Sequence, residues 1–202
     1  NDTYNELASE SKGIYKEKGS KFIAYAFPVH SNEDIREKIQ QIKKQEYAAR
    51  HHCYAYILHA NKSEQRANDD CEPSSSAGKP ILGRISSNNL TNTLVIVARY
   101  FGGVKLGVPG LINAYKTATS KAISATKIIS QTINKEYEIT FNYQQINSVM
   151  RIIKKYDLKI KDTNFKIECK LIFAVRESRS QEIEDILKRK HELGIKTIKN
   201  IS

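Results

Sequence analysis

The sequence predicts an α+β protein with two domains: an α/β sandwich in residues 1–131 and a ferredoxin-like domain in residues 132–202. In the first part, apolar runs of strand length alternate with segments of helical periodicity. After Gln131 the alternation restarts in the order β-α-β-β-α-β, which is typical of the ferredoxin-like split βαβ motif. The composition agrees, since 40% hydrophobic and 27% charged residues over 202 positions are ordinary for folded domains.

The first domain is expected to alternate strands with helices. Ser31 precedes a segment with Ile35, Ile39 and Ile42 at helical spacing, so it is the expected N-cap of the first helix. Residues 60–76 are polar and rich in Ser, Asn and Asp, and are expected to form a long loop. The expected strands are Ser20–Val29, His52–His59 and Thr91–Phe101, and the expected helices run from Ser31 to about Tyr47, from Gly78 to Asn89 and from Gly110 to about Lys127.

The second domain has clear apolar periods. Val149, Ile152 and Ile153 share one helix face, and Ile183, Ile186 and Leu187 share another. The expected elements are strand Asn134–Tyr143, helix Ile146–Tyr156, a hairpin pair Leu158–Asn164 and Phe165–Val175, a helix from Ser180 to about Leu193, and strand Ile195–Ile201.

A glycine-rich turn, RYFGGVKLGVPG from Arg99 to Gly110, lies between the strand ending near Phe101 and the helix expected at Gly110. Free backbone N–H groups and the positive end of a helix dipole favour an anion at such a turn. The spacing fits neither the dinucleotide nor the P-loop fingerprint. Two interpretations stay open: an anion or RNA-backbone site, and a tight turn that only lets the helix pack on the sheet.

Charge is the main deviation in composition. The formal net charge is +11, with 18 basic against 12 acidic residues up to Gln131 and 15 against 10 after it. A field of this sign attracts phosphate-rich partners or anionic membranes, although a lysine-rich background that serves solubility gives the same count.

The pattern of cysteines and the N-terminal residues bear on the cellular compartment of the protein. Cys53, Cys71 and Cys169 are odd in number and widely spaced, so we expect no disulfide framework, no zinc ribbon and a reducing, cytoplasmic location. No apolar run has the length of a membrane span, and the first residues are too polar for a signal peptide. The chain begins with Asn, so we expect that residues precede it in the gene product.

Two further clusters could carry chemistry. Arg50, His51 and His52 stand at the head of the second strand, where adjacent histidines point to opposite faces, so at most one can serve a given site. An acidic loop with Asp69, Asp70 and Glu72 precedes Gly78 and Lys79. Carboxylates with a histidine could bind a metal or act as an acid–base pair. We expect instead that they accept hydrogen bonds from Arg50, from Lys79 or from backbone N–H groups near Gly78, and so hold the loop beside the glycine turn. Interleaved basic and aromatic residues suit RNA better than catalysis, and the aromatic members are Tyr54, Tyr56, Tyr100 and Phe101. For any single tyrosine, a half-buried place in the sheet with a satisfied hydroxyl is the commoner alternative.

Three segments, taken together, carry a family resemblance: RHHCYAYIL, DDCEPSSSAGKPIL and NTLVIVARYFGGVKLGVPGLINAY. In this order and with these gaps, the chain resembles the YigZ/IMPACT family from about Ser20 to Ala125. The sequence departs from the family pattern at Cys71, at Ser75 with Ser76, and at Pro109. The first two weaken the expectation that the acidic loop needs positive φ, and Pro109 removes one N–H donor from the turn.

The resemblance implies a fold and a field of function. The first domain would be similar to domain 2 of ribosomal protein S5 and domain IV of elongation factor G, and the second to domain V of that factor. Eukaryotic relatives modulate translation through a regulator of an initiation-factor kinase, and nucleic-acid binding has been proposed for bacterial members.

We therefore expect a non-catalytic protein of the translation apparatus that binds RNA or a ribosome-associated complex, with no cofactor, no metal and no membrane partner. The alternatives are a small-molecule or phosphoester hydrolase that uses the acidic loop and His51, and a regulator that binds a protein through the same surface. The residues expected to bind nucleic acid or an anion are Arg50, His51, Lys79, Arg99, Tyr100, Gly102, Gly103, Lys105, Gly107 and Gly110, supported by Asp69, Asp70 and Glu72. These three clusters are expected to meet on one face of the first domain.

Overall fold

The computed structural model describes residues 2–201, with side chains up to residue 198. The chain is a mixed α/β protein that divides by backbone contacts into two compact units. Tyr4–Gln131 forms the larger unit, and the smaller one joins the residues up to Thr3 to the chain from Thr132 onward.

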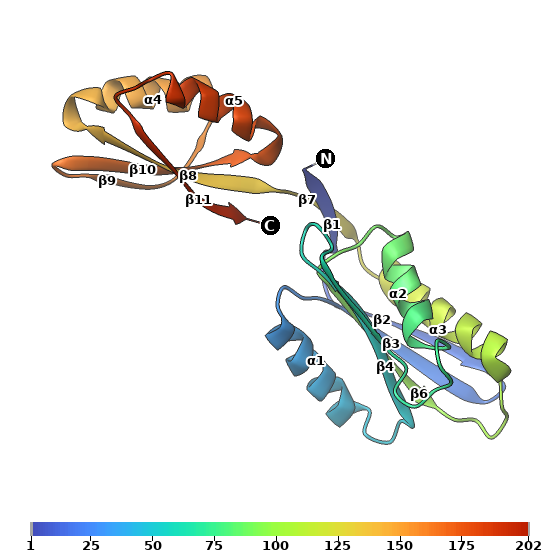
Figure 1. Ribbon diagram of the computed structural model, residues 1–202. Helices are drawn as coiled ribbons and strands as arrows, with labels where there is room; N and C mark the ends of the chain where they lie inside the picture. The colour runs from blue at the N-terminus through green and yellow to red at the C-terminus, as the bar shows by residue number, and fades with distance from the viewer. Residues whose placement is uncertain (1, 202) are drawn as a thin grey trace. The chain divides into compact units, whose positions relative to one another are not determined.

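The larger unit is built on a five-stranded antiparallel sheet with strand order β2-β3-β6-β4-β5. Helix α1 covers one face of this sheet, and α2 and α3 cover the other (Figure 1). Its elements are β1 (Thr3–Leu7, which starts in the smaller unit), β2 (Ser11–Glu17), β3 (Ser20–Pro28), α1 (Asn32–Gln45), β4 (His51–Leu58), β5 (Glu64–Asn68), α2 (Gly78–Ser87), β6 (Thr93–Tyr100), α3 (Gly107–Ser124) and β7 (Ile128–Thr132, which ends in the smaller unit).

The expected helices and central strands of this unit are present, with shifted ends and additional strands. Ser31 caps α1 by accepting a hydrogen bond from the Asp34 N–H at 3.1 Å. The loop expected at 60–76 contains β5, and the polar N-terminal stretch contains β1 and β2. Each of these strands has an exposed or edge position, which gives it little of the apolar alternation on which sequence recognition depends.

The smaller unit follows the order β8, α4, β9, β10, α5, β11, which is the expected β-α-β-β-α-β succession. Its four strands pair antiparallel in the order β11-β8-β10-β9, and α4 and α5 lie on one face of the sheet (Figure 1). The bounds are β8 (Asn134–Asn142), the 3-10 turn η1 (Tyr143–Gln145), α4 (Ile146–Lys155), β9 (Lys159–Phe165), β10 (Glu168–Arg176), α5 (Glu177–Lys188) and β11 (Gly194–Ile201).

The N-terminal residues lie with the smaller unit, although the sequence analysis grouped them with residues 1–131. The Asp2 carboxylate accepts hydrogen bonds from Arg176 Nε at 2.7 Å and from Arg176 Nη2 at 3.0 Å. It also accepts one from the Ser178 N–H at 3.2 Å, and the Arg176 and Ser178 hydrogen bonds hold the pKa of Asp2 well below its usual value. The Asp2 carbonyl accepts the Ile133 N–H, and β1 pairs with β7 in a two-stranded sheet.

Three apolar clusters fill the molecule. Two lie on opposite faces of the five-stranded sheet, and the third lies beneath α4 and α5. Among the described residues, no helix is both long and apolar enough to cross a membrane.

Candidate functional site

Two neighbouring strand ends supply the first site residues. His51 on β4 is paired with Arg99 on β6, so their side chains leave the same face of the sheet, toward α2 and α3. The next residue on each strand points to the α1 face, as strand alternation requires. There, His52 Nε2 lies 2.8 Å from the Glu46 carbonyl oxygen, and the Tyr100 hydroxyl donates to Glu46 Oε2. His51 and Arg99 therefore share a site from which His52 and Tyr100 are excluded.

The acidic loop between β5 and α2 is folded around Asp69. One carboxylate oxygen of Asp69 accepts the N–H of Gly78 at 2.8 Å and that of Ala77 at 3.2 Å, and the other accepts the Ser75 N–H at 2.8 Å. This arrangement confirms the expectation that a carboxylate binds backbone N–H groups near Gly78. The side chain of Asp70 accepts the His52 N–H at 2.7 Å.

The loop also uses the left-handed backbone region at Asp70, Cys71 and Ser75, with φ of 39°, 67° and 62°. The inference that Cys71 and Ser75 argue against positive φ is therefore wrong, since the loop takes this conformation without glycine. The cost of a non-glycine residue there is compensated by the fixed hydrogen bonds to Asp69.

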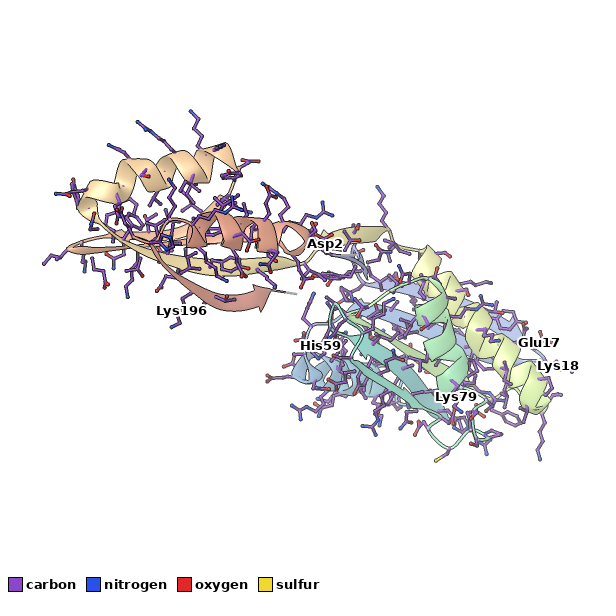
Figure 2. The ribbon with its side chains drawn as sticks, turned by 45° about the horizontal axis from the view of Figure 1, so that its top comes forward. Asp2, Glu17, Lys18, His59, Lys79 and Lys196 are labelled. Atoms are coloured by element: carbon purple, nitrogen blue, oxygen red, sulfur yellow. The ribbon has the colours of Figure 1, made fainter. Side chains whose placement is uncertain are left out.

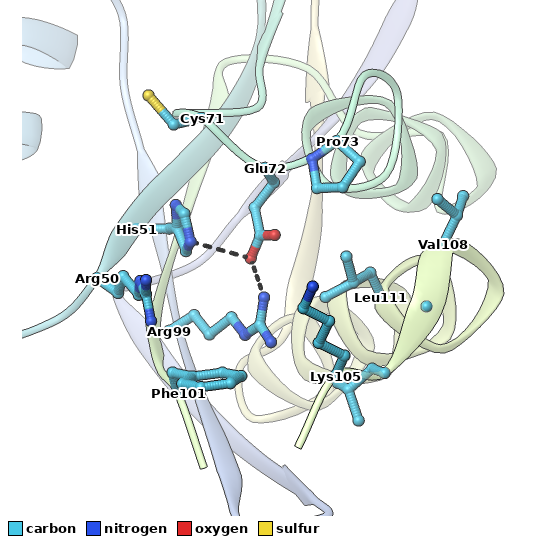
Figure 3. A pocket seen from close by; sticks show the side chains of 12 residues that line it. Arg50, His51, Cys71, Glu72, Pro73, Arg99, Phe101, Lys105, Val108 and Leu111 are labelled. Atoms are coloured by element: carbon cyan, nitrogen blue, oxygen red, sulfur yellow. Dashed lines mark hydrogen bonds and ion pairs between the residues drawn. The ribbon is translucent and has the colours of Figure 1, made fainter. Parts of the chain in front are cut away.

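Glu72, only 8% exposed, is the centre of the site (Figure 3). Its Oε1 accepts hydrogen bonds from Arg99 Nη1 at 2.5 Å and from the Tyr115 hydroxyl at 2.8 Å, and lies 3.7 Å from His51 Nε2. Burial, with Cys53 and Glu72 nearby, raises the pKa of Tyr115, so its hydroxyl stays protonated and donates. Of the partners expected for these carboxylates, the backbone N–H groups are correct for Asp69, but the cation that pairs with Glu72 is Arg99 rather than Arg50 or Lys79.

The glycine turn brings the start of α3 to the same place. Gly102 packs against the turn between β2 and β3, where an added Cβ would lie 2.0 Å from the Gly19 carbonyl carbon. Its N–H is engaged by Ser20 Oγ at 3.2 Å, so Gly102 serves close packing. Helix α3 begins at Gly107, with φ of 72°, three residues before the expected start, and no side chain caps it. The first N–H groups of α3 therefore lack a capping side chain.

The three clusters meet at one pocket of about 540 Å³, as expected from the sequence. Its wall carries three cationic side chains, Arg50, Arg99 and Lys105, and one carboxylate, Glu72. His51, Arg99 and Lys105 point toward one another around Glu72 (Figure 3). The lining residues are Arg50, His51, Cys71, Glu72, Pro73, Arg99, Phe101, Lys105, Leu106, Gly107, Val108 and Leu111.

Several expected site residues do not line this pocket. Tyr100 contacts Glu46 on the other face of the sheet, and Lys79 stands on the first turn of α2 (Figure 2). The remaining ones are Gly102, Gly103, Gly110, Asp69 and Asp70.

Two aromatic residues also contribute to the site: Phe101, which the sequence patterns had singled out, and Tyr115, which was missed. Arg50 and Arg99 both place their guanidinium carbons over the Phe101 ring, at 5.1 and 5.6 Å from its centre. Tyr115 is a buried residue in the middle of α3, and nothing in the local sequence distinguishes it from an ordinary core tyrosine.

The family model for the Impact N-terminal domain matches residues 18–123, more than half of the chain and all of the pocket. The chain belongs to the IMPACT family. It is 33% identical over 146 residues to IMPACT family member YvyE of Bacillus subtilis, covering 72% of this chain and 67% of that protein. It is 30% identical over 191 residues to an IMPACT family member of Haemophilus influenzae, covering 91% of each.

A solved structure has the same fold over nearly the whole chain. The crystal structure of a hypothetical protein superposes with a TM-score of 0.72 at 24% identity, covering 98% of each chain. The IMPACT family match thus rests on sequence, and the two-unit fold recurs in an experimental structure.

Proposed function

We propose that the pocket binds a phosphate group of RNA, within a ribosome or another complex of the translation apparatus, and that it does so without catalysing a reaction. The observation that carries this proposal is a buried, unpartnered donor. Arg99 is 6% exposed and its Nε, within the described part of the chain, has no hydrogen-bond partner. A buried N–H without an acceptor is costly, and an oxyanion in the pocket would supply one.

Other groups of the pocket favour the same ligand. The N-terminus of α3 has no capping side chain and offers N–H groups and a positive dipole end beside Lys105. Lys105 itself enters no hydrogen bond or ion pair among the residues that the structure describes. Together with Arg50 and Arg99, Lys105 gives the pocket three cationic side chains. The one carboxylate that lines it, Glu72, is already paired with Arg99.

The net charge of +11 supports a large polyanion rather than a small one, because it is spread over both halves of the chain. The link to translation comes from the IMPACT family resemblance. We also propose, on strand order and element succession, an S5 domain 2-like first domain and a ferredoxin-like second domain. A cytoplasmic location belongs to the same proposal.

The hydrolase alternative has weaker support. Asp69 and Asp70 accept backbone hydrogen bonds, and the buried Glu72 is engaged by Arg99 and Tyr115, so all three carboxylates hold the protein itself. Of the three, only Glu72 lines the pocket, and its Oε1 already accepts two hydrogen bonds from the protein, which disfavours the role of a general base or metal ligand.

The test is the salt dependence of binding to ribosomes or to single-stranded RNA. For the Lys105→Ala variant we expect the slope of log affinity against log salt to fall by about one, because one phosphate contact is lost. Lys79→Ala removes the same charge outside the pocket and serves as the matched control. Equal effects of the two variants would contradict the pocket assignment, and a flat salt response in the wild type would favour a protein partner.

A further inference from the structure

We propose that the pocket takes a ribonucleotide in preference to a deoxyribonucleotide, because His51 Nε2 accepts a hydrogen bond from the ribose 2′-hydroxyl beside the bound phosphate. This proposal rests on the proposed function and names the chemistry that His51 adds to it.

The hydrogen bonding of His51 fixes which ring nitrogen accepts. His51 Nδ1 lies 2.7 Å from the Asp70 carbonyl oxygen, and a carbonyl oxygen can only accept. Nδ1 therefore carries a proton, and in the neutral form of the ring Nε2 is the nitrogen that accepts. The left-handed backbone at Asp70 holds this carbonyl in place.

No protein donor that the structure describes is bonded to His51 Nε2. Its near neighbour is Glu72 Oε1 at 3.7 Å, which is an acceptor and is already hydrogen-bonded by Arg99 and Tyr115. His51 lines the pocket and its side chain is 14% exposed, so a ligand can reach the ring.

An acceptor among donors restricts the ligand. Arg99 Nε, Lys105 and the start of α3 all donate, and a phosphodiester has only acceptors to offer them. His51 Nε2 would remain unsatisfied beside a bare phosphate, whereas a hydroxyl next to the phosphate would satisfy it. In RNA the 2′-hydroxyl is adjacent to the 3′-phosphate, and it is the group by which proteins distinguish RNA from DNA.

The experiment measures the affinity of the full chain for four oligonucleotides of one sequence, with ribose, 2′-deoxy, 2′-fluoro and 2′-O-methyl sugars, at one salt concentration. Fluorine keeps the sugar pucker of RNA but cannot donate. We expect RNA to bind roughly three- to tenfold more tightly than the 2′-fluoro strand, the effect of one hydrogen bond. A 2′-fluoro strand that binds as well as RNA would overturn the proposal, since strand shape would then explain any preference.

A variant locates the effect. His51→Ala should reduce the ratio of RNA affinity to 2′-fluoro affinity to within twofold of one, whereas His191→Ala, on an exposed position of the smaller unit, should leave this ratio unchanged. An equal loss for both strands in His51→Ala would contradict the role of Nε2. If no strand binds in a salt-dependent manner, the proposed function itself fails. Displacement of RNA by equimolar adenosine monophosphate would instead assign the site to free nucleotides.

Discussion

Two buried glutamates occupy opposite faces of the same sheet at the same strand ends. Glu72 is 8% exposed and Glu46 is 9% exposed. Arg99 and His51 reach Glu72, and the residues that follow them, Tyr100 and His52, reach the Glu46 side. One pair of adjacent strands thus builds two polar clusters by alternation alone.

The partners make the two clusters different. Glu46 accepts from the Tyr25 hydroxyl at 2.5 Å and from the Tyr100 hydroxyl, and no Lys or Arg nitrogen that the structure describes lies at ion-pair distance from it. Glu72 is paired with the guanidinium of Arg99 and faces a pocket with further cations. The Glu46 cluster is complete within the protein and ends helix α1, whereas the Glu72 cluster leaves a donor without an acceptor. This difference supports the proposal that the Glu72 face serves a ligand, whereas the contacts of Glu46 serve stability.

Replacing Arg99, the cation paired with Glu72, should have the largest effect on the free energy of unfolding. Arg99→Leu leaves a buried carboxylate without its guanidinium, so we expect the free energy of unfolding to fall by about 3–5 kcal/mol. Urea denaturation measures it. The double variant Arg99→Leu with Glu72→Gln should recover a substantial part, because the uncompensated charge is gone. A loss below 1 kcal/mol in Arg99→Leu would show that the pair is not a buried ion pair in solution.

The second largest effect on stability is expected from the loop that carries Glu72, which is folded around Asp69. Asp69→Ala removes an acceptor of three backbone N–H groups, so we expect a loss of about 2–3 kcal/mol and faster amide exchange at Ser75, Ala77 and Gly78. The amides of helix α1 should exchange as in the wild type, because their hydrogen bonds lie within the helix. Unchanged exchange at these three amides would contradict the central role of Asp69.

The comparison also shows what sequence could predict. The opposite directions of His51 and His52 followed from strand geometry, and the convergence of the three clusters followed from their places at strand and helix ends. The side-chain partners could not be predicted from the sequence. Arg99 donates to Glu72, which lies 27 positions away in the chain, and this pairing depends on how a loop without regular structure folds back. The strands β1, β2, β5 and β7 were missed because all four are edge strands, which show little apolar alternation.

A smaller effect on the free energy of unfolding is expected in the Glu46 cluster, and its size depends on pH. Burial would raise the pKa of Glu46, but hydrogen bonds from Tyr100 and Tyr25 outweigh it and lower the pKa below the ordinary 4.5. A lowered pKa stabilises the fold above pH 4.5, and this contribution is lost as the pH falls through the pKa of the folded state.

Tyr100→Phe should therefore cost about 1.5 kcal/mol at pH 7, and the difference from the wild type should narrow toward pH 3. Thermal or urea unfolding across this range measures it. The same hydrogen bond raises the pKa of Tyr100 to about 12, so a tyrosine titrating at that pH should disappear from the absorbance titration of the variant. A difference that stays constant with pH would show that the hydroxyl does not bond an ionised Glu46.

The smallest expected effect lies at Cys71, which stands on the rim of the pocket with φ of 67°. A non-glycine residue in the left-handed region is strained by about 1–2 kcal/mol. Glycine relieves this strain, but its greater conformational freedom in the unfolded chain offsets part of the gain in stability. Cys71→Gly should therefore stabilise the protein by about 0.5–1 kcal/mol. Cys71→Ala, which keeps the Cβ and the strain, is the matched control and should not stabilise. Because Cys71 brings no charge to the pocket, the affinity for RNA should stay within twofold in both variants. A destabilised Cys71→Gly variant would show that the thiol contributes contacts that outweigh the backbone strain.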